Sequence, residues 1–404
     1  MSAPAQNSRR VDVLIVGGGI AGLTLAALLR DSPLRVALVE RQPLPALDAA
    51  PELRVSAIGR AAMQVFDDCG ALPALLGDEP FRAAAFTDMH VWDSTGAGEL
   101  HFDSAEVGLD ALGYIIENRR IQRALWQRID TAGNIELLCP AAVQHIARDA
   151  DGLRVQLDHG ESLHCRLIVG ADGLQSAVRR FAGIDYAVQD YRQRALVCTV
   201  KTELAHQHTA WQIFLPGGPL AFLPLFAAAE SDQCSIVWSL PQAEAESLLA
   251  LEEASFIARL EQAFEYRLGR LQPASERAAF PLRHGHAASY VQSNLALVGD
   301  AAHIIHPLAG QGANLGLLDA RELARVILDA HAGRRQWWAR HTLRAYERAR
   351  KGENRVMEAA MSGFNLLFSN DNPWLAMARN AGLNLVDHAP LIKHQFMRIT
   401  GAGA

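Results

Sequence analysis

The hydrophobic positions near the N-terminus follow two different periods in succession. Val11–Val16 is an apolar run rich in β-branched residues, which is typical of a buried strand. The chain then passes through Gly17-Gly18-Gly19-Ile20-Ala21-Gly22 into the apolar helical segment Leu23–Leu29. A second strand, Arg35–Val39, ends at Glu40. This pattern predicts a βαβ unit with a glycine-rich turn between its first strand and its helix.

Similar patterns predict the elements of the rest of the chain. Helices are expected at Asn118–Ile129, at Ser255–Leu268 and from Gly312 to about Ala330, with a helical tail from Trp337. Strands are expected at Val143–Ala147, Leu153–Leu157, Ser162–Val169, Ala195–Lys201, Ala210–Leu215, Leu220–Leu225, Cys234–Leu240 and Leu295–Val298. The aromatic side chains on these strands are expected in the core: Trp211, Phe214, Phe222 and Phe226. The order of elements predicts an α/β fold with mixed sheets.

Composition narrows the class of protein. Half of the 404 residues are hydrophobic, so the chain can bury a large core. The formal net charge is -6 without a basic stripe, so we expect no nucleic-acid partner. Five scattered cysteines without a C-x-x-C pair fit a reducing compartment and argue against a disulfide framework or a metal site. No apolar run reaches the ~18–20 residues that span a bilayer, which predicts a soluble cytoplasmic protein or one lying on a membrane surface.

The glycine-rich turn is the first motif that carries chemistry. In Gly17-x-Gly19-x-x-Gly22, the first glycine allows a tight turn, the second lets the backbone approach a pyrophosphate, and the third allows close helix–strand packing. The helix N-terminus then presents free N–H groups to the phosphates. Glu40 can accept hydrogen bonds from an adenosine ribose. The unit therefore predicts a bound dinucleotide.

Two later segments favour FAD over NAD. One is Leu167–Gly173, and the other is Leu295–His303 with the following Pro307–Gly316. Asp300 follows a buried strand, where it can bind a hydroxyl chain such as the ribityl of FAD. The turn that opens the next helix can stabilise negative charge on a reduced flavin.

These segments resemble the class A flavoprotein monooxygenases, the family of para-hydroxybenzoate hydroxylase, and more closely its ubiquinone-biosynthesis hydroxylases. Leu53–Ile58, Tyr346-Glu347-Arg348 and Phe364–Pro373 also resemble that subfamily. Ala313 departs from the bulkier aliphatic residue expected there. The resemblance implies a Rossmann-like FAD-binding domain, a mixed-sheet substrate domain and a helical C-terminal tail. FAD binding would involve residues 1–79, 117–183 and 281–335, the substrate domain residues 80–116 and 184–280, and the C-terminal helices residues 336–404.

The resemblance also implies roles for single residues. The ADP half of FAD would contact Gly17, Gly19, Gly22, Glu40 and Arg41. Arg54 would lie near the flavin and pyrophosphate, Gln122 would reach the flavin side, and Asp172 belongs to a DG motif linked to both FAD and NAD(P)H use. Asp300 would bind the ribityl, and Pro307 and the backbone of Gly312, Ala313 and Asn314 would line the isoalloxazine. Pro307 and Gly312 are the candidate catalytic positions, through their place in the flavin loop, and no side-chain base is assigned. A solvated arginine, a surface glutamine and an ordinary turn are the alternative interpretations of Arg54, Gln122 and Asp172.

The implied activity is hydroxylation of the ring of a polyprenyl phenol in ubiquinone biosynthesis, with NAD(P)H as reductant and O₂ as co-substrate. Two alternatives stay open: a hydroxylase of a small soluble phenol, and a non-catalytic FAD-binding subunit of a biosynthetic complex. The hydrophobic phenolic substrate leaves open membership of a ubiquinone-biosynthesis complex, a homo-oligomer and peripheral contact with the inner face of the membrane. Residues Asn372–Arg398 are apolar with interspersed cations, which suits either an interfacial helix or a packed tail.

Overall fold

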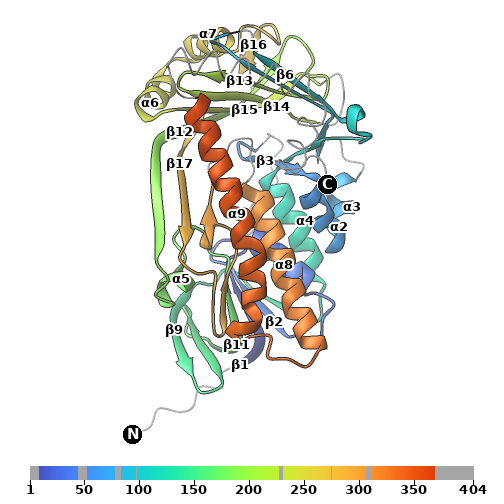
Figure 1. The fold of residues 1–404 in the computed structure, drawn as a ribbon, viewed down its shortest axis with the longest axis vertical. Coiled ribbons are helices and arrows are strands. Elements are labelled where there is room, and N and C mark those ends of the chain that lie inside the picture. The colour runs from blue at the N-terminus through green and yellow to red at the C-terminus, as the bar shows by residue number, and fades with distance from the viewer. Residues whose placement is uncertain are drawn as a thin grey trace.

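The computed structural model describes residues 9–43, 52–77, 83–96, 98–226, 231–273, 275–305 and 312–368. Two large sheets form the two lobes of an elongated molecule (Figure 1). Two long paired strands, β12 (Tyr186–Thr202) and β17 (Ala278–Ala287), run between the lobes. The α/β fold class predicted from the sequence is confirmed.

The first sheet contains the predicted βαβ unit. β1 (Arg9–Val16) pairs in parallel with β2 (Val36–Val39) and with β11 (Ser162–Gly170). The sheet continues through β19 (Leu295–Leu297) on the β11 side and β8 (Ile135–Leu138) on the β2 side. Further strands at this sheet are β9 (Val143–Asp149), β10 (Gly152–Leu157) and β18 (Val291–Gln292). Because the parallel strands end at one edge, the segments that follow β1, β11 and β19 are brought together.

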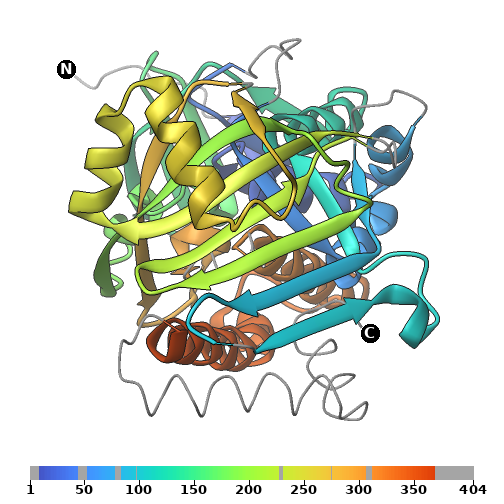
Figure 2. The same ribbon diagram turned by 90° about the horizontal axis from the view of Figure 1, so that it is seen from above.

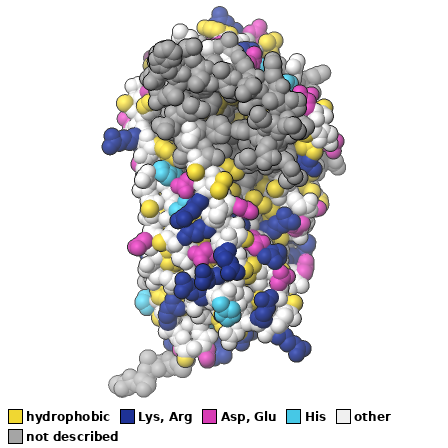
Figure 3. Space-filling view, in the orientation of Figure 1, with side chains coloured by type: hydrophobic (Ala, Val, Ile, Leu, Met, Phe, Trp, Pro, Cys, Tyr) yellow, Lys and Arg dark blue, Asp and Glu magenta, His cyan; other side chains and the backbone are white. Residues whose placement is uncertain are grey.

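Helices cover the first sheet. α1 (Ile20–Leu28) is largely buried and packs against α8 (Gly312–Ala332) and α4 (Asn118–Asp130). α9 (Arg340–Phe368) packs on the outside of α8. On the face that α8 and α9 form, Lys and Arg side chains are interspersed with Asp and Glu (Figure 3). Among the described helices, none is both long and apolar enough to cross a membrane.

The second sheet has the strand order β20-β17-β12-β15-β14-β13-β5-β6. Its remaining members are β5 (Asp88–Asp93), β6 (Glu99–Asp103), β13 (Thr209–Leu215), β14 (Gly218–Pro224), β15 (Gln233–Pro241), β16 (Leu271–Pro273) and β20 (His303–Ile304). α6 (Gln242–Ala250) and α7 (Glu253–Ala263) lie over its outer face (Figure 2). Alternate strand residues such as Leu196, Phe222 and Trp238 form a core with these helices. The opposite face of the sheet is turned toward the first lobe.

A small third sheet lies between the lobes. It consists of β3 (Val55–Gly59), β7 (Gly113–Glu117) and β4 (Ala84–Phe86). The remaining helices of the described residues are short. They are α2 (Arg60–Asp68), α3 (Leu72–Leu76), α5 (Ala177–Phe181) and the 3-10 turns Ser104–Val107 and Gly299–Ala301. The expected substrate segment 80–116 thus supplies β5 and β6 to the second sheet, and β4 and most of β7 to the third.

Candidate functional site

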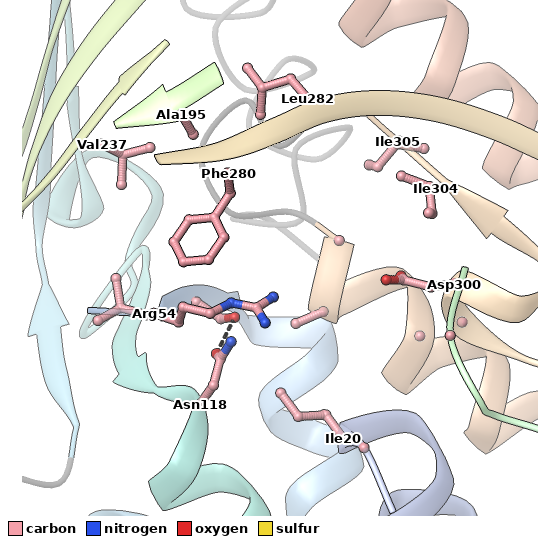
Figure 4. Close-up of a pocket in the computed structure, with 18 of the residues that line it drawn as sticks. Ile20, Arg54, Asn118, Ala195, Val237, Phe280, Leu282, Asp300, Ile304 and Ile305 are labelled. Carbon is pink, nitrogen blue, oxygen red and sulfur yellow. Dashed lines mark hydrogen bonds between the residues drawn. The ribbon is translucent and has the colours of Figure 1, made fainter. Parts of the chain in front are cut away.

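A cavity of about 650 Å³ lies between the two lobes. Its floor is formed by the glycine turn, the Asp300 turn and the first turn of α8, and its roof by the second sheet (Figure 4). The volume falls within the range of small-molecule sites in proteins. Gly19, Arg54, Gln122 and Asp300, which are distant in the sequence, line this cavity together.

The glycine turn depends on backbone geometry that side chains would obstruct. Gly17 has a φ of +109°, and a Cβ placed there would lie 2.3 Å from the carbonyl oxygen of Ala171. A Cβ on Gly22 would lie 2.0 Å from the carbonyl oxygen of Gly17. At Gly19 a Cβ would meet no atom within 4 Å, because this residue opens onto the cavity. Gly19 also begins α1 without a side-chain cap, so the positive end of the helix faces the cavity.

Glu40 lies beside the glycine turn. One of its carboxylate oxygens accepts a hydrogen bond from the Gly18 N–H, and the other accepts one from the Gln42 N–H at 2.8 Å. The turn and the end of β2 are therefore tied together by one acidic side chain. Arg41 is exposed and does not line the cavity.

The Asp300 turn forms another part of the floor. Gly299 has a φ of +57°, and a Cβ there would come 3.2 Å from the Cβ of Ala21 on α1. The carboxyl group of Asp300 points into the cavity (Figure 4). Desolvation by the surrounding protein raises its pKa, while the nearby His303 and Arg54 act in the opposite direction. A carboxyl group held this way is suited to hydrogen bonding with hydroxyl groups of a ligand.

Arg54 immediately precedes β3, and its guanidinium group reaches into the cavity. It lies 5.7 Å from the ring centre of Phe280, which projects from β17 in the roof. Within the described part of the chain, no carboxylate forms an ion pair with Arg54. Gln122 of α4 lines the same wall, with its Nε2 3.5 Å from the carbonyl oxygen of Gly18. The floor therefore offers a cation and an amide to a ligand.

The first residues of α8 have two different roles. Gly312 and Ala313 line the cavity. Asn314 is buried instead, where its side chain accepts from the Gly59 N–H at 3.1 Å and donates to the Ala57 carbonyl at 2.8 Å. It therefore fastens α8 to β3. Pro307 lies outside the described residues.

Asp172 lies behind the cavity wall that its neighbours Ala171 and Gly173 form. Its Oδ2 accepts hydrogen bonds from the N–H groups of Ala177 and Val178, at 2.7 and 3.3 Å, and so caps α5. Its Oδ1 is buried without a hydrogen-bond partner among the described residues. The structure thus gives Asp172 contacts with the backbone of the following helix.

Arg179 on α5 was missed by the sequence analysis. Its guanidinium donates to the carbonyl of Ala301 at 2.8 Å and to that of Leu174, and it lies 3.9 Å from the ring centre of Tyr186. The side chain therefore connects the Asp172 turn to the Asp300 turn. No local pattern in the sequence indicates this connection.

A buried polar network behind the Asp300 turn was also missed. Asp319 is fully buried in α8 and accepts hydrogen bonds from the Gly299 N–H at 3.2 Å and from Arg350 Nε at 2.9 Å. The cavity-lining His303 places its Nε2 2.5 Å from the same carboxylate. Burial alone would raise the pKa of Asp319, but His303 and Arg350 outweigh it and lower that pKa. An aspartate within the apolar stripe of α8 is the one sequence signal that could have revealed this network.

The other candidate chemistries find no support in the described residues. No group of three or more His, Cys, Asp or Glu side chains among them is arranged to hold a metal ion. The five cysteines are free, and burial raises the pKa of the Cys69 thiol to about 11 and that of Cys165 to about 12. The aromatics expected in the core, Trp211, Phe214, Phe222 and Phe226, are absent from the described lining of the cavity.

The floor fits FAD. It combines an uncapped helix N-terminus, a glycine with open space above it, a cation that forms no ion pair with a carboxylate of the described residues, and a carboxyl group facing the cavity. These are the groups that a pyrophosphate and a polyhydroxylated chain require. The roof, by contrast, is mostly apolar and suits an organic ring.

Comparison with known proteins agrees with this geometry. The family model described as FAD binding domain matches residues 10–360. The chain is 36% identical to the 3-demethoxyubiquinol 3-hydroxylase of Escherichia coli, over 96% of this chain and 97% of that protein. It is 38% identical to the ubiquinone hydroxylase UbiL of Rhodospirillum rubrum, over 96% of this chain and 88% of that protein.

A solved structure has the same fold. PqsL of Pseudomonas aeruginosa, described as a probable FAD-dependent monooxygenase, superposes with a TM-score of 0.76 at 26% identity, covering 93% of this chain and 100% of that chain. The family match and the relatives above 30% identity both extend along most of the sequence. The chain therefore belongs to the FAD-binding domain family, as an FAD-dependent aromatic-ring monooxygenase related to the ubiquinone hydroxylases.

Proposed function

We propose that this chain hydroxylates the ring of a polyprenyl phenol in ubiquinone biosynthesis, with FAD as cofactor, NAD(P)H as reductant and O₂ as co-substrate. The observation that carries the proposal is one continuous cavity with a polar floor suited to FAD and an apolar roof suited to an aromatic ring. The names of the two curated relatives support the pathway.

The proposed contacts to FAD follow from the floor. The start of α1 with Gly17, Gly19 and Gly22, together with Glu40, would hold the ADP half, and Arg41 would lie at its outer edge. Further contacts would come from Arg54, Gln122, Asp300, Gly312 and Ala313, with Asn314 and Asp172 positioning the backbone. Bound FAD supplies the transfer of electrons from NAD(P)H to O₂ and of one oxygen atom to the ring.

The protein's own contribution is to orient the ring and to exclude water. The roof places Ala195, Val197 and Val237 against the cavity, and these side chains offer no hydrogen bond to water. We assign no side chain as the base for the phenol. Pro307, the other candidate in the flavin loop, remains a prediction from the sequence.

The chemistry of the proposed substrate also bears on the location and the partners of the enzyme. A polyprenyl chain partitions into a bilayer, so the enzyme must receive its substrate from the membrane surface or from a partner. This supports peripheral contact with the inner face of the membrane, and equally membership of a ubiquinone-biosynthesis complex. A homo-oligomer stays a prediction from the sequence. The segment expected to be interfacial, Asn372–Arg398, lies outside the described residues.

The alternative of a small soluble phenol also has an observation in its favour. PqsL has been solved in complex with 2-aminobenzoylacetate, and its TM-score with this chain is 0.76. A relative of the same fold therefore accepts a compact ligand.

One assay tests the proposal. The purified holoenzyme is given NADH or NADPH under ¹⁸O₂ with a geranylated phenol, a water-soluble phenol or no phenol. We expect faster NAD(P)H oxidation and incorporation of one ¹⁸O atom with the geranylated phenol. Product from the soluble phenol alone would favour the second candidate. Binding of FAD without product from either phenol would instead favour a non-catalytic subunit.

A further inference from the structure

We propose that the side chains of Gln212 and Ser239 recognise the oxygen substituents of the substrate ring by hydrogen bonding. Both side chains belong to the roof panel, which we define as Gln212, Ala221, Val237, Val197, Ser239, Ala195 and Phe280 on the cavity face of the second sheet. The inference rests on the proposed function and names the side chains that recognise the ring of the proposed substrate.

The register of the strands aligns the roof panel in two rows. Gln212 of β13 pairs with Ala221 of β14, Ala221 with Val237 of β15, and Val237 with Val197 of β12. In the next row, Ser239 of β15 pairs with Ala195 of β12, and Ala195 with Phe280 of β17. Figure 4 shows Ala195, Val237 and Phe280 together on this side of the cavity. The panel is therefore assembled from strands that are distant in the sequence.

The alternation of each strand fixes which residues face the cavity. Leu196, Phe222 and Trp238, the neighbours of panel residues along their strands, lie in the core with α6 and α7. Because successive strand residues point to opposite faces, the panel residues must point toward the first lobe. Slipping any strand by one residue would bring large core side chains into the cavity.

Most of the panel is small and apolar, which leaves Gln212 and Ser239 as its polar members. Neither side chain has a hydrogen bond to another described residue. Ser239 is only 4% exposed. Withdrawing a polar group from water without a partner costs free energy, so a ligand atom that supplies the missing hydrogen bond is favoured.

The spacing matches two separate oxygens of one ring. Gln212 and Ser239 stand two strands and two residues apart, which places their Cα atoms roughly 12 Å from each other. An amide and a hydroxyl can each donate or accept, so they suit a ring hydroxyl or a methoxy oxygen. Phe280, the sole phenyl ring among the described lining residues, lies at the end of the second row, where it can contact the ring itself.

The test uses two geranylated phenols that differ only in a methoxy or an ethyl group on the ring. Binding to the oxidised holoenzyme is measured from the change in flavin absorbance, before any turnover. We expect the wild type to prefer the methoxy compound by roughly three- to tenfold, the size of one or two neutral hydrogen bonds. The double variant Gln212→Leu/Ser239→Ala should bind both phenols equally.

Ser235→Ala is the matched control, because Ser235 is buried on the same strand and face but is absent from the cavity lining. It should keep the wild-type preference, and the FAD content and melting temperature of each variant verify its fold. The inference is overturned if the double variant retains the preference, if Ser235→Ala abolishes it, or if the wild type shows none. A wild type that binds neither phenol and forms no product defeats the proposed function itself, whereas the other outcomes leave that function standing.

Discussion

The floor and the roof of the cavity are held in shape by different means. The floor depends on glycines with positive φ and on buried polar side chains that fasten one turn to another, as Asp319 fastens Gly299. The roof depends on the register of a regular sheet whose other face is packed against helices. A change to a positive-φ glycine or to a buried polar tie of the floor therefore disturbs both the fold and the cofactor site, while a change in the roof panel can alter the ligand with little effect on the fold.

This difference suits the two tasks of the cavity. A dinucleotide is the same molecule in every turnover and requires fixed N–H groups and one cation, which rigid turns supply. A substrate ring is recognised by the shape of the cavity wall and by a few polar groups on it. In the roof panel, these polar groups are the side chains of Gln212 and Ser239, and most of their neighbours are small and apolar.

The largest expected effect comes from breaking the floor's buried network. Asp319→Ala would leave Arg350, which is 5% exposed, without its buried partner. We expect it to lower the free energy of unfolding by about 3–5 kcal/mol, measured by urea denaturation. Asp329→Ala is the matched control, because Asp329 pairs with Arg325 on the same helix but is exposed, and it should cost less than about 1 kcal/mol. Equal losses in the two variants would contradict the role of burial.

The second prediction separates cofactor binding from folding. Asp300→Ala should weaken FAD binding by about 1.5–3 kcal/mol, roughly 10- to 150-fold, because it removes a charge-assisted contact. The side chain faces the cavity, so the unfolding transition of the FAD-free protein should change little. Titration of FAD-free protein by flavin fluorescence measures the affinity. Gln212→Leu in the roof should keep the wild-type affinity, and unchanged binding by Asp300→Ala would refute the ribityl contact.

The third prediction compares two glycines of one turn. Gly22→Ala places a Cβ 2.0 Å from a backbone oxygen, so we expect a loss of about 1–3 kcal/mol in unfolding free energy. Gly19→Ala meets no atom within 4 Å, so it should fold normally but bind FAD more weakly, because its methyl group enters the cofactor's space. Melting temperatures of the FAD-free proteins and FAD titrations measure the two effects separately. The assignment fails if the two variants behave alike in both measurements.

The floor of the cavity could be predicted from the sequence more completely than the roof. The βαβ unit could be predicted because its strand, turn and helix are contiguous, and α1 begins only three residues before the predicted helix start, at Ile20 rather than Leu23. The Asp300 turn was recognisable for the same reason. Arg179 and Asp319 could not be assigned partners, because their contacts depend on segments far away in the chain.

The roof was the least accessible to sequence reasoning. β12 begins at Tyr186 rather than at the predicted Ala195, because the intervening residues are largely polar and hide the strand. Gln212 carries no signal of its own, since its place in the cavity results from pairing with Ala221 and through it with β15. Register between strands is a property of the assembled sheet, and a single strand's pattern does not specify it.

The smallest expected effect concerns the aromatic ring that joins floor and roof. Phe280 is 39% exposed and lies beside the Arg54 guanidinium, so its ring can contact a substrate on one side and a cation on the other. An aromatic pair between Phe280 and a bound phenol contributes about 0.5–1.5 kcal/mol beyond the area it buries, so Phe280→Leu should weaken phenol binding by roughly two- to twelvefold and leave stability nearly unchanged. It should also lower the yield of hydroxylated product per NAD(P)H oxidised, because a ring held less firmly is hydroxylated less often. Phe222→Leu is the control on the opposite face of the same sheet. The Phe222 ring is fully buried and stacked on Phe264, so its loss should lower the melting temperature and leave the yield unchanged. A fall in yield for Phe222→Leu would show that the roof and its helix-covered face are not independent. An unchanged yield for Phe280→Leu would refute the contact between its ring and the substrate.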